Sequence, residues 1–337
     1  MANITFSEGS NLNNSIYGNS QAPIRMMIEK KAEAFEDQSV LEKVFMMDES
    51  KHWAEKYTSM TAMDGFDPVG ENGAYPLDGM EESFSKTLEH TTWKNSFSIS
   101  REIMEDGKVM DLKKKPQAFV SSYYRTREEF GAALFGAALN CESEIKFRNK
   151  ILNTTCADYL PLFNTMHPSK IDPAFRQCNV FGDAFSEDAL AALEVAMQSF
   201  KGDNGELVNV VPNTIIIPND MALKKAVFAA IGADKDPATA NNGFNFLFGR
   251  WQVMVWSYLN RYIAPGSYPW ILADLDYNEE NGGAILSDRT PLDVRSTLDE
   301  NTDANVWRGY ARFSCGFNDW RAFAAAGMEG FDPLIED

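Results

Sequence analysis

The chain contains few side chains that could carry out catalysis. Histidine occurs three times in 337 residues, at His52, His90 and His167, and none of the three lies in a recognisable nucleophile or metal-binding motif. Catalysis needs several titratable groups that converge on one point. The phosphate-binding loop, the nucleophile elbow and the His-Glu-x-x-His pair are all absent from the sequence. The residue types therefore favour a structural protein over an enzyme.

Cys156 and His167 come closest to a nucleophile and its base. Such a pair needs a third group that orients the imidazole, and the sequence offers none. His167 precedes Pro168 in a predicted loop, where we expect it to make structural hydrogen bonds. A role for His167 as a ligand or general base is the alternative.

Two acidic segments imitate metal sites. Residues 274–278 begin like a calcium-binding loop, but Glu279 stands where the loop needs glycine and Ile285 where it needs a bidentate glutamate. We therefore expect a turn after a strand at 270–273, with an adventitious divalent site as the alternative. A second acidic cluster is expected to be a solvated loop and not a metal cage: Asp299, Glu300 and Asp303. The sequence predicts no metal and no cofactor.

The formal net charge of -18 limits the classes of partner. So acidic a chain repels phosphate backbones and anionic lipids, which argues against specific nucleic-acid or membrane binding. The only basic triplet, at 113–115, is expected on a solvated surface, and contact with an acidic neighbour or nucleic acid is its alternative. The aromatic run at 251–258 lacks a basic groove beside it, so we expect a buried strand and not a base-stacking surface.

Length and composition are those of a folded protein with room for two domains. Hydrophobic residues make up 44% of the chain, enough to fill real cores. No run of eighteen apolar residues and no amino-terminal signal peptide is present, so we expect a cytoplasmic protein. The four cysteines lie far apart without a Cys-x-x-Cys pair, which predicts reduced thiols.

The first hundred residues predict three elements. Residues 1–21 lack apolar periodicity and predict an extended or flexible arm, and 23–47 has the pattern of an amphipathic helix whose apolar side needs a cover. Glycine and proline crowd into 65–79, and polar and apolar residues alternate after them, which predicts a long hairpin with a glycine-rich tip over 58–106. A two-stranded ribbon is marginal alone in water, so we expect a neighbouring surface to support it. An ordinary hairpin lying on its own domain is the alternative.

The rest of the chain predicts an α+β fold. A long helix is expected over 117–149. In the alternative, Thr126 and Glu129 form a capping box, the helix proper begins at Thr126, and 119–125 is a preceding turn. A helix at 186–201 has Ser186 as its N-cap. The remaining expected elements are a strand at 214–217, a helix capped by Asn219 and ended by Gly232, and strands at 251–259, 304–317 and 320–325.

Three segments carry a resemblance to a known family: 97–106, 162–168 and 212–220. In their order along the chain they resemble the major capsid proteins of tailed bacteriophages, the Hong Kong 97 type. The resemblance implies an α+β capsid fold with these parts: an amino-terminal arm with its helix at 1–57, an extended hairpin loop at 58–100, a peripheral domain with a long spine helix at 101–159 and 291–326, an axial domain at 160–290, and a tail at 327–337.

The resemblance also implies a function in the virion. Pentamers and hexamers of the chain would assemble in the host bacterial cytoplasm into an icosahedral shell around double-stranded DNA, without sequence-specific DNA binding. Scaffold and portal proteins are implied partners, and a decoration protein is a further one. We expect the assembly interface to include the following residues: Phe66, Tyr75, Phe84, Trp93, Phe97, Arg101, Glu102, Arg127 and Glu128. An encapsulin-like compartment shell and, in a different class, a cytosolic hydrolase are the alternatives.

Overall fold

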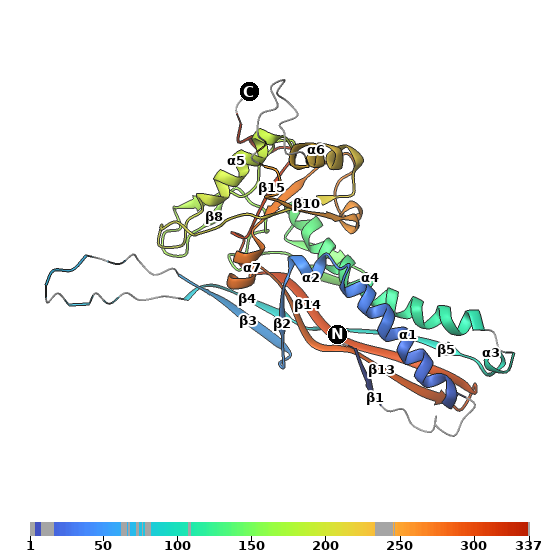
Figure 1. Cartoon of the computed structure of the whole chain (residues 1–337). Coiled ribbons are helices and arrows are strands. Elements are labelled where there is room, and N and C mark those ends of the chain that lie inside the picture. Colours follow the sequence, from blue (N-terminus) through green and yellow to red (C-terminus); the bar gives the residue numbers. More distant parts are fainter. Residues whose placement is uncertain are drawn as a thin grey trace.

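The computed structural model is a mixed α+β protein whose two largest sheets have five and four strands, with a projecting two-stranded hairpin (Figure 1). It describes residues 4–7, 17–61, 66, 68–71, 74–75, 77, 82–106, 109–232, 245 and 247–335. Among these residues, no helix is both long and apolar enough to cross a membrane.

The larger sheet is built around two long antiparallel strands, β13 (Ala284–Asp299) and β14 (Ala304–Phe317). β5 (Thr91–Ile99) pairs antiparallel with β14. β1 (Ile4–Ser7) and β2 (Met46–Glu49) pair parallel with β13. The predicted strand at 304–317 is confirmed. β13 was not predicted, since it contains a proline and shifts its register twice between Asp288 and Asp293, which breaks the alternation of a regular strand.

Two helices cover one face of the larger sheet, α1 (Gly18–Glu36) and α4 (Val109–Leu139) (Figure 1). The predicted bounds of the long helix were wrong at both ends, because the helix continues through Pro116 on the amino side and stops ten residues short of Asn149. Thr126 is not an N-cap, since it lies inside α4 and its hydroxyl donates to the carbonyl of Ser122 at 2.7 Å.

The amino-terminal predictions need two corrections. The described part of the arm at 4–7 is extended, as β1 paired with β13, but the arm ends earlier than predicted because α1 begins at Gly18. The predicted helix at 23–47 is divided: α1 begins earlier, a short helix α2 (Leu41–Val44) follows, and β2 completes the segment. Ile24, Ile28 and Ala32 form the buried stripe of α1, so the need for a covering surface is met within the chain.

The smaller sheet has the order β11-β10-β12-β15. Its strands are β10 (Thr214–Pro218), β11 (Gln252–Trp256), β12 (Trp270–Ala273) and β15 (Phe323–Ala326). The helices α5 (Glu187–Gln198) and α6 (Met221–Ile231) belong to the same unit (Figure 1). The predictions of strands 214–217 and 270–273 are confirmed. The final strand begins later than predicted, and β15 places residues 323–326 in the smaller sheet.

Helix caps in this unit partly follow the sequence. Ser186 caps α5 as predicted, with its side chain accepting from the N–H of Ala189. Asp220 caps α6 in place of the predicted Asn219. The strand predicted to reach Leu259 ends at Trp256, where a 3-10 helix η1 (Ser257–Arg261) begins. The predicted turn at 274–278 is a helix, α7 (Leu275–Asn281), whose N-cap is Asp274.

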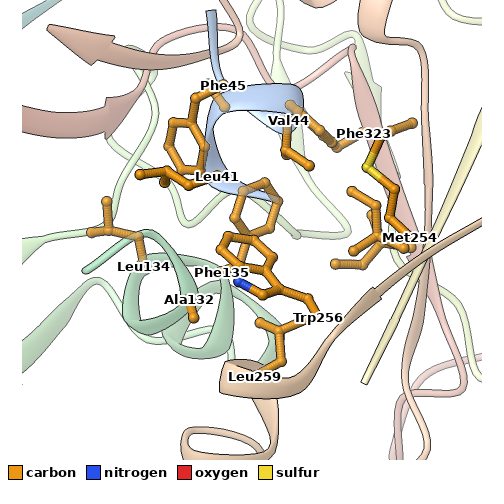
Figure 2. Close-up of a cluster of buried hydrophobic side chains, with 14 of the residues drawn as sticks. Leu41, Val44, Phe45, Ala132, Leu134, Phe135, Met254, Trp256, Leu259 and Phe323 are labelled. Atoms are coloured by element: carbon orange, nitrogen blue, oxygen red, sulfur yellow. The ribbon is translucent and has the colours of Figure 1, made fainter. Parts of the chain in front are cut away.

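Phe135 of α4 lies in the hydrophobic cluster that joins the two sheets (Figure 2). Its ring makes edge contacts with Phe45, Trp256, Phe317 and Phe323, at centroid distances of 5.1–5.7 Å. Phe317 belongs to the larger sheet, and Trp256 and Phe323 belong to the smaller one. This cluster fixes how the two sheets are oriented.

The hairpin consists of β3 (Ala54–Met60) and β4 (Glu82–Glu89), paired antiparallel. It is two-stranded as predicted, but its bounds differ, since β5 belongs to the larger sheet. The remaining described elements are the helix α3 (Arg101–Glu105) and two antiparallel strand pairs, β6 (Glu144–Phe147) with β7 (Lys150–Asn153) and β8 (His167–Pro168) with β9 (Arg176–Gln177).

Gly136 of α4 provides a test of how tightly this helix packs. A Cβ there would lie 2.3 Å from the Cβ of Tyr262. Alanine is favoured over glycine in a helix by about 1 kcal/mol. We nevertheless expect Gly136→Ala to lower the free energy of unfolding by about 1–3 kcal/mol, because the added methyl group overpacks the core. Urea denaturation measures the change. Gly70→Ala, in open space, is the control, and a stabilised Gly136→Ala protein would contradict the packing.

Candidate assembly surfaces

The connection between β3 and β4, residues 61–81, is here called the tip. Its described apolar side chains are almost fully solvated: Phe66, Leu77 and Tyr75 are 107%, 100% and 94% exposed. Val69 is 54% exposed. A soluble chain rarely presents so many large apolar groups together unless another surface covers them.

Polar contacts fix the base of the hairpin to the body of the protein. Ser83 donates a short hydrogen bond to Asp203. Lys86 Nζ donates to the carbonyl of Thr155 and to Asn153 Oδ1, both at 2.7 Å. Burial of Lys86 lowers its pKa. The base of the hairpin therefore leaves the body in a defined direction, in which β3 and β4 project from the two sheets (Figure 1).

His90 lies at the bend where the hairpin meets the larger sheet, between β4 and β5. Its backbone N–H donates to the carbonyl of Trp53 at 3.1 Å, and its Nδ1 lies 3.3 Å from Ser314 Oγ. Burial lowers the pKa of His90, and the positive charges of Arg289 and Arg312 lower it further. The bend is therefore built around a neutral imidazole.

Arg127 of α4 is buried and engaged within the chain. Its two terminal nitrogens donate to the two carboxylate oxygens of Asp288, each at 3.0 Å. It also donates to Tyr123 Oη at 3.0 Å and lies 3.5 Å from Glu42. Burial raises the pKa of Glu42. This bidentate pair ties α4 to β13 across the middle of the larger sheet.

Glu128, the next residue, connects α4 to two other segments. Its Oε1 accepts from Ser39 Oγ at 2.5 Å and from the N–H of Leu41 at 3.3 Å. Its Oε2 accepts from Trp256 Nε1 at 3.1 Å. Burial raises the pKa of Glu128. Arg127 and Glu128 thus serve the internal structure, and a part in contacts between chains stays a prediction for both.

The other predicted interface residues fall into two groups. Trp93 and Phe97 are half-buried under α4, where their rings stack on Phe313 and Trp307 at 5.2 and 6.0 Å. The second group lies away from α4: Phe84 is half-buried with Lys170 Nζ 4.9 Å from its ring, and Arg101, which pairs with Glu105 and Asp303, and Glu102 are exposed. The structure therefore brings only part of the predicted interface together on the surface.

The residues considered for catalysis have structural roles. His167 is completely buried, with Nδ1 2.6 Å from Asp158 Oδ2 and its ring stacked on Trp320 at 4.4 Å. This confirms the expected hydrogen-bonding role, and Asp158 is the partner that the sequence did not reveal. Burial raises the pKa of Cys156 well above its usual value, which disfavours a thiolate nucleophile.

The acidic side chains at 274–278 and 299–303 also have structural roles. Asp274 caps α7 and accepts from the N–H of Val211 at 2.6 Å. Asp299 accepts from the N–H of Asn301 in the exposed turn between β13 and β14, as expected of a solvated loop. In the described part of the chain, no group of three or more acidic, histidine or cysteine side chains is arranged to hold a metal ion.

Comparison with known proteins gives a family match and several structural matches. The family model described as phage capsid protein matches residues 84–326. A comparison with curated proteins found no match. The chain is similar in fold to the capsid of Myoviridae phage XM1, with 11% identity over 85% of this chain and 90% of that chain and a TM-score of 0.51.

Two further solved capsids are similar at comparably low identity. The capsid of Ralstonia phage GP4 has 10% identity over 84% of this chain and 86% of that chain, with a TM-score of 0.50. The capsid of bacteriophage JBD30, decorated with minor capsid protein trimers, has 14% identity over 66% of this chain and 91% of that chain, with a TM-score of 0.44.

Removing the buried arginine should be far more damaging than removing an exposed one. Arg127→Met leaves Asp288 buried without its partner, and we expect the free energy of unfolding to fall by about 3–5 kcal/mol. Arg101→Met, which breaks an exposed ion pair, should leave the denaturation midpoint unchanged. Urea titration of both variants measures the contrast. Equal losses would show that Arg127 does not hold α4 to β13.

The neutral imidazole at the bend predicts a pH dependence of stability. Because the folded pKa of His90 lies below the unfolded value of about 6.5, its stabilising effect is complete above that pH and is lost as the pH falls through the folded pKa. We expect the difference in unfolding free energy between wild type and His90→Gln to shrink below pH of about 6.5. Denaturation at several pH values measures this. Parallel curves would contradict it.

Proposed function

The chain belongs to the phage capsid protein family, and from this premise we propose that its hairpin joins neighbouring subunits of the shell. As a member of that family it is a structural protein of the virion shell and not an enzyme. The resemblance to phage capsid proteins is thereby confirmed. The hairpin β3–β4 would lie over an adjacent subunit, with the tip in contact with that subunit. The observation that carries the proposal is the near-complete exposure of Phe66, Tyr75 and Leu77.

The proposed division of the chain follows the two sheets. The larger sheet with α4 would be the peripheral domain, with α4 as the spine helix, and the unit built on the smaller sheet would be the axial domain. β13 extends the peripheral part back to Ala284, and β15 belongs with the axial part. The sheet pairings support these boundaries, which refine the expected limits of 291–326 and 160–290.

The mode of association is heterologous, because the tip and the surface that receives it are different parts of the chain. Such contacts form rings when the rotation between neighbours closes. Rings of five and six copies would then give an icosahedral shell around double-stranded DNA. Scaffold, portal and decoration proteins are proposed as further partners.

The tip should matter for assembly and not for folding. We expect the triple variant Phe66→Ser, Tyr75→Ser and Leu77→Ser to lose shells and rings in electron micrographs, because it removes the apolar surface that a neighbour would cover. Its unfolding free energy should stay within about 0.5 kcal/mol of wild type, since these side chains are solvated.

A matched control and a contrary outcome complete the test. Met26→Ser removes an exposed apolar side chain on α1, 68% exposed, and should leave assembly intact. Shells of normal number and appearance from the triple variant would overturn the role of the hairpin. The contents of purified shells distinguish a genome container from an encapsulin-like compartment, because a genome gives nuclease-protected DNA and a compartment gives enclosed protein.

A further inference from the structure

Two arginines lie beside His90 at the bend where the hairpin meets the larger sheet (Figure 1). Ser314 Oγ lies 3.3 Å from His90 Nδ1, so both side chains are on one face of the sheet. Arg312, two residues before Ser314 in β14, points to the same face, because side chains alternate along a strand. Arg289 of β13 is close enough for its charge to act on the imidazole. We call Arg289, Arg312 and His90 the arginine corner.

The strand pairing brings these like charges together. Arg312 pairs with Thr92 of β5 on one side and with Thr290 of β13 on the other. Arg289 occupies the first register shift of β13, where this strand carries one residue more than β14. Such a bulge changes the direction in which a side chain points. The shift therefore explains how Arg289 reaches the side of the sheet on which His90 lies.

The arginine corner lies on the side of the sheet away from α4. Phe313, which stands between Arg312 and Ser314 in β14, contacts the ring of Phe130 of α4 at a centroid distance of 6.0 Å. Trp93 of β5 contacts the same ring at 5.6 Å. The residues that alternate with these two aromatic side chains therefore point away from the helix.

The two arginines have no counter-charge within the described part of the chain. Neither guanidinium forms an ion pair or a hydrogen bond there. The carboxylates of Glu55 and Asp288 act on His90 through their charge, but each already has another partner. Glu55 accepts from Ser50 Oγ at 2.6 Å, and Asp288 is bound by Arg127 at 3.0 Å. The two positive charges of the corner are therefore left to repel each other.

Two nitrogen atoms of the corner lack a hydrogen-bond partner among the described residues. They are His90 Nε2 and Arg312 Nε, and both are buried. When the Ser314 hydroxyl donates to Nδ1, the neutral imidazole carries its hydrogen on Nε2 and is a donor there. Arg312 Nε is always a donor. A buried donor without an acceptor is unfavourable, so the corner lacks an acceptor.

A ligand can reach the corner through the ends of the arginine side chains. Arg289 and Arg312 are half-buried, and the terminal nitrogens of their guanidinium groups are not enclosed. Thr92 is exposed and Thr290 is half-buried, one on each side of Arg312. Their hydroxyls are further donors for a ligand bound there.

We infer that the arginine corner binds a small oxyanion of the phosphate class. Two unpaired guanidinium groups suit a ligand with more than one negative charge, and arginine binds phosphate oxygens through paired hydrogen bonds. A tetrahedral anion can offer separate oxygens to Arg289, Arg312 and His90 at once, whereas a carboxylate has only two oxygens. The bound ion would connect β5, β13 and β14 where the hairpin begins, which goes beyond the proposed function of the hairpin.

The position of the unpaired nitrogens favours a free ion over the backbone of DNA. His90 is 8% exposed, so a ligand that reaches Nε2 must be small. DNA binding depends on many phosphate contacts along an extended surface. The remainder of a chain with net charge -18 repels such a polyanion.

Calorimetric titration of the purified chain with inorganic phosphate tests the site directly. We expect saturable binding at constant ionic strength, and Arg312→Met should weaken it by about tenfold or more, because charge-assisted hydrogen bonds are lost. Arg289→Met should have the same effect. Arg308→Met is the matched control, since Arg308 is an exposed arginine of the same strand outside the corner, and its affinity should stay within about twofold of wild type.

Thermal denaturation gives a second readout that does not depend on measuring the binding heat. Without phosphate, Arg312→Met should unfold at the same temperature as wild type or higher, because it removes a repulsion between like charges. With phosphate, wild type should gain more than Arg312→Met, since the ion binds the folded state. Phosphate also stabilises proteins in general, so the decisive quantity is the difference between these two gains, with Arg308→Met as the control for net charge.

Three results would overturn the inference. Equal phosphate affinity of wild type and Arg312→Met would place the ion outside the corner. Equal stabilisation of wild type by acetate and by phosphate at the same ionic strength would show no preference for a tetrahedral anion. Displacement of phosphate by a short DNA duplex, together with loss of duplex binding in Arg312→Met, would assign the arginines to nucleic acid instead of a free ion.

Discussion

The contacts of a single helix, α4, hold this structure together. Its carboxyl half supplies Phe135 to the cluster that joins the two sheets, and its middle supplies Arg127, which binds β13 through Asp288. One contact is apolar and the other is a buried ion pair, so α4 is fixed both in position and in rotation about its axis. The direction of the hairpin depends on this arrangement, because β5 packs beneath the same helix.

Local features of the fold could be predicted from the sequence, because their causes are local. Ser186 caps its helix by its own hydroxyl, and the alternation from Ala304 to Phe317 is regular enough to identify the strand. The predictions that failed concern pairing at a distance. No sequence feature near Ile4 indicates that it pairs with Leu292. The register shifts around Pro291 interrupt the alternation of the sixteen-residue strand β13, so the strand could not be recognised. Likewise, the split between β4 and β5 follows from the pairing of β5 with β14, which lies far along the chain.

The same distinction applies to the candidate surfaces. The exposed aromatic residues of the tip could be predicted, because glycine and proline around them leave no regular element in which to bury them. The internal role of Arg127 could not be predicted, since Asp288 lies far along the chain. The proximity of Lys94, Arg295 and Arg308 was also hidden, because the strands β5, β13 and β14 must be aligned before these residues become neighbours.

The pairing order of the larger sheet has a consequence for synthesis on the ribosome. β1, β2 and β5 come early in the chain, and within the described residues each of them pairs with β13 or β14 alone. Bringing together segments so far apart in sequence is slow and requires both to be present. During translation these early strands therefore stay unpaired until β13 and β14, residues 284–317, have been synthesised. A chain that terminates before β13 lacks both central strands of the larger sheet. Such a fragment cannot form the folded subunit, so it cannot enter a shell.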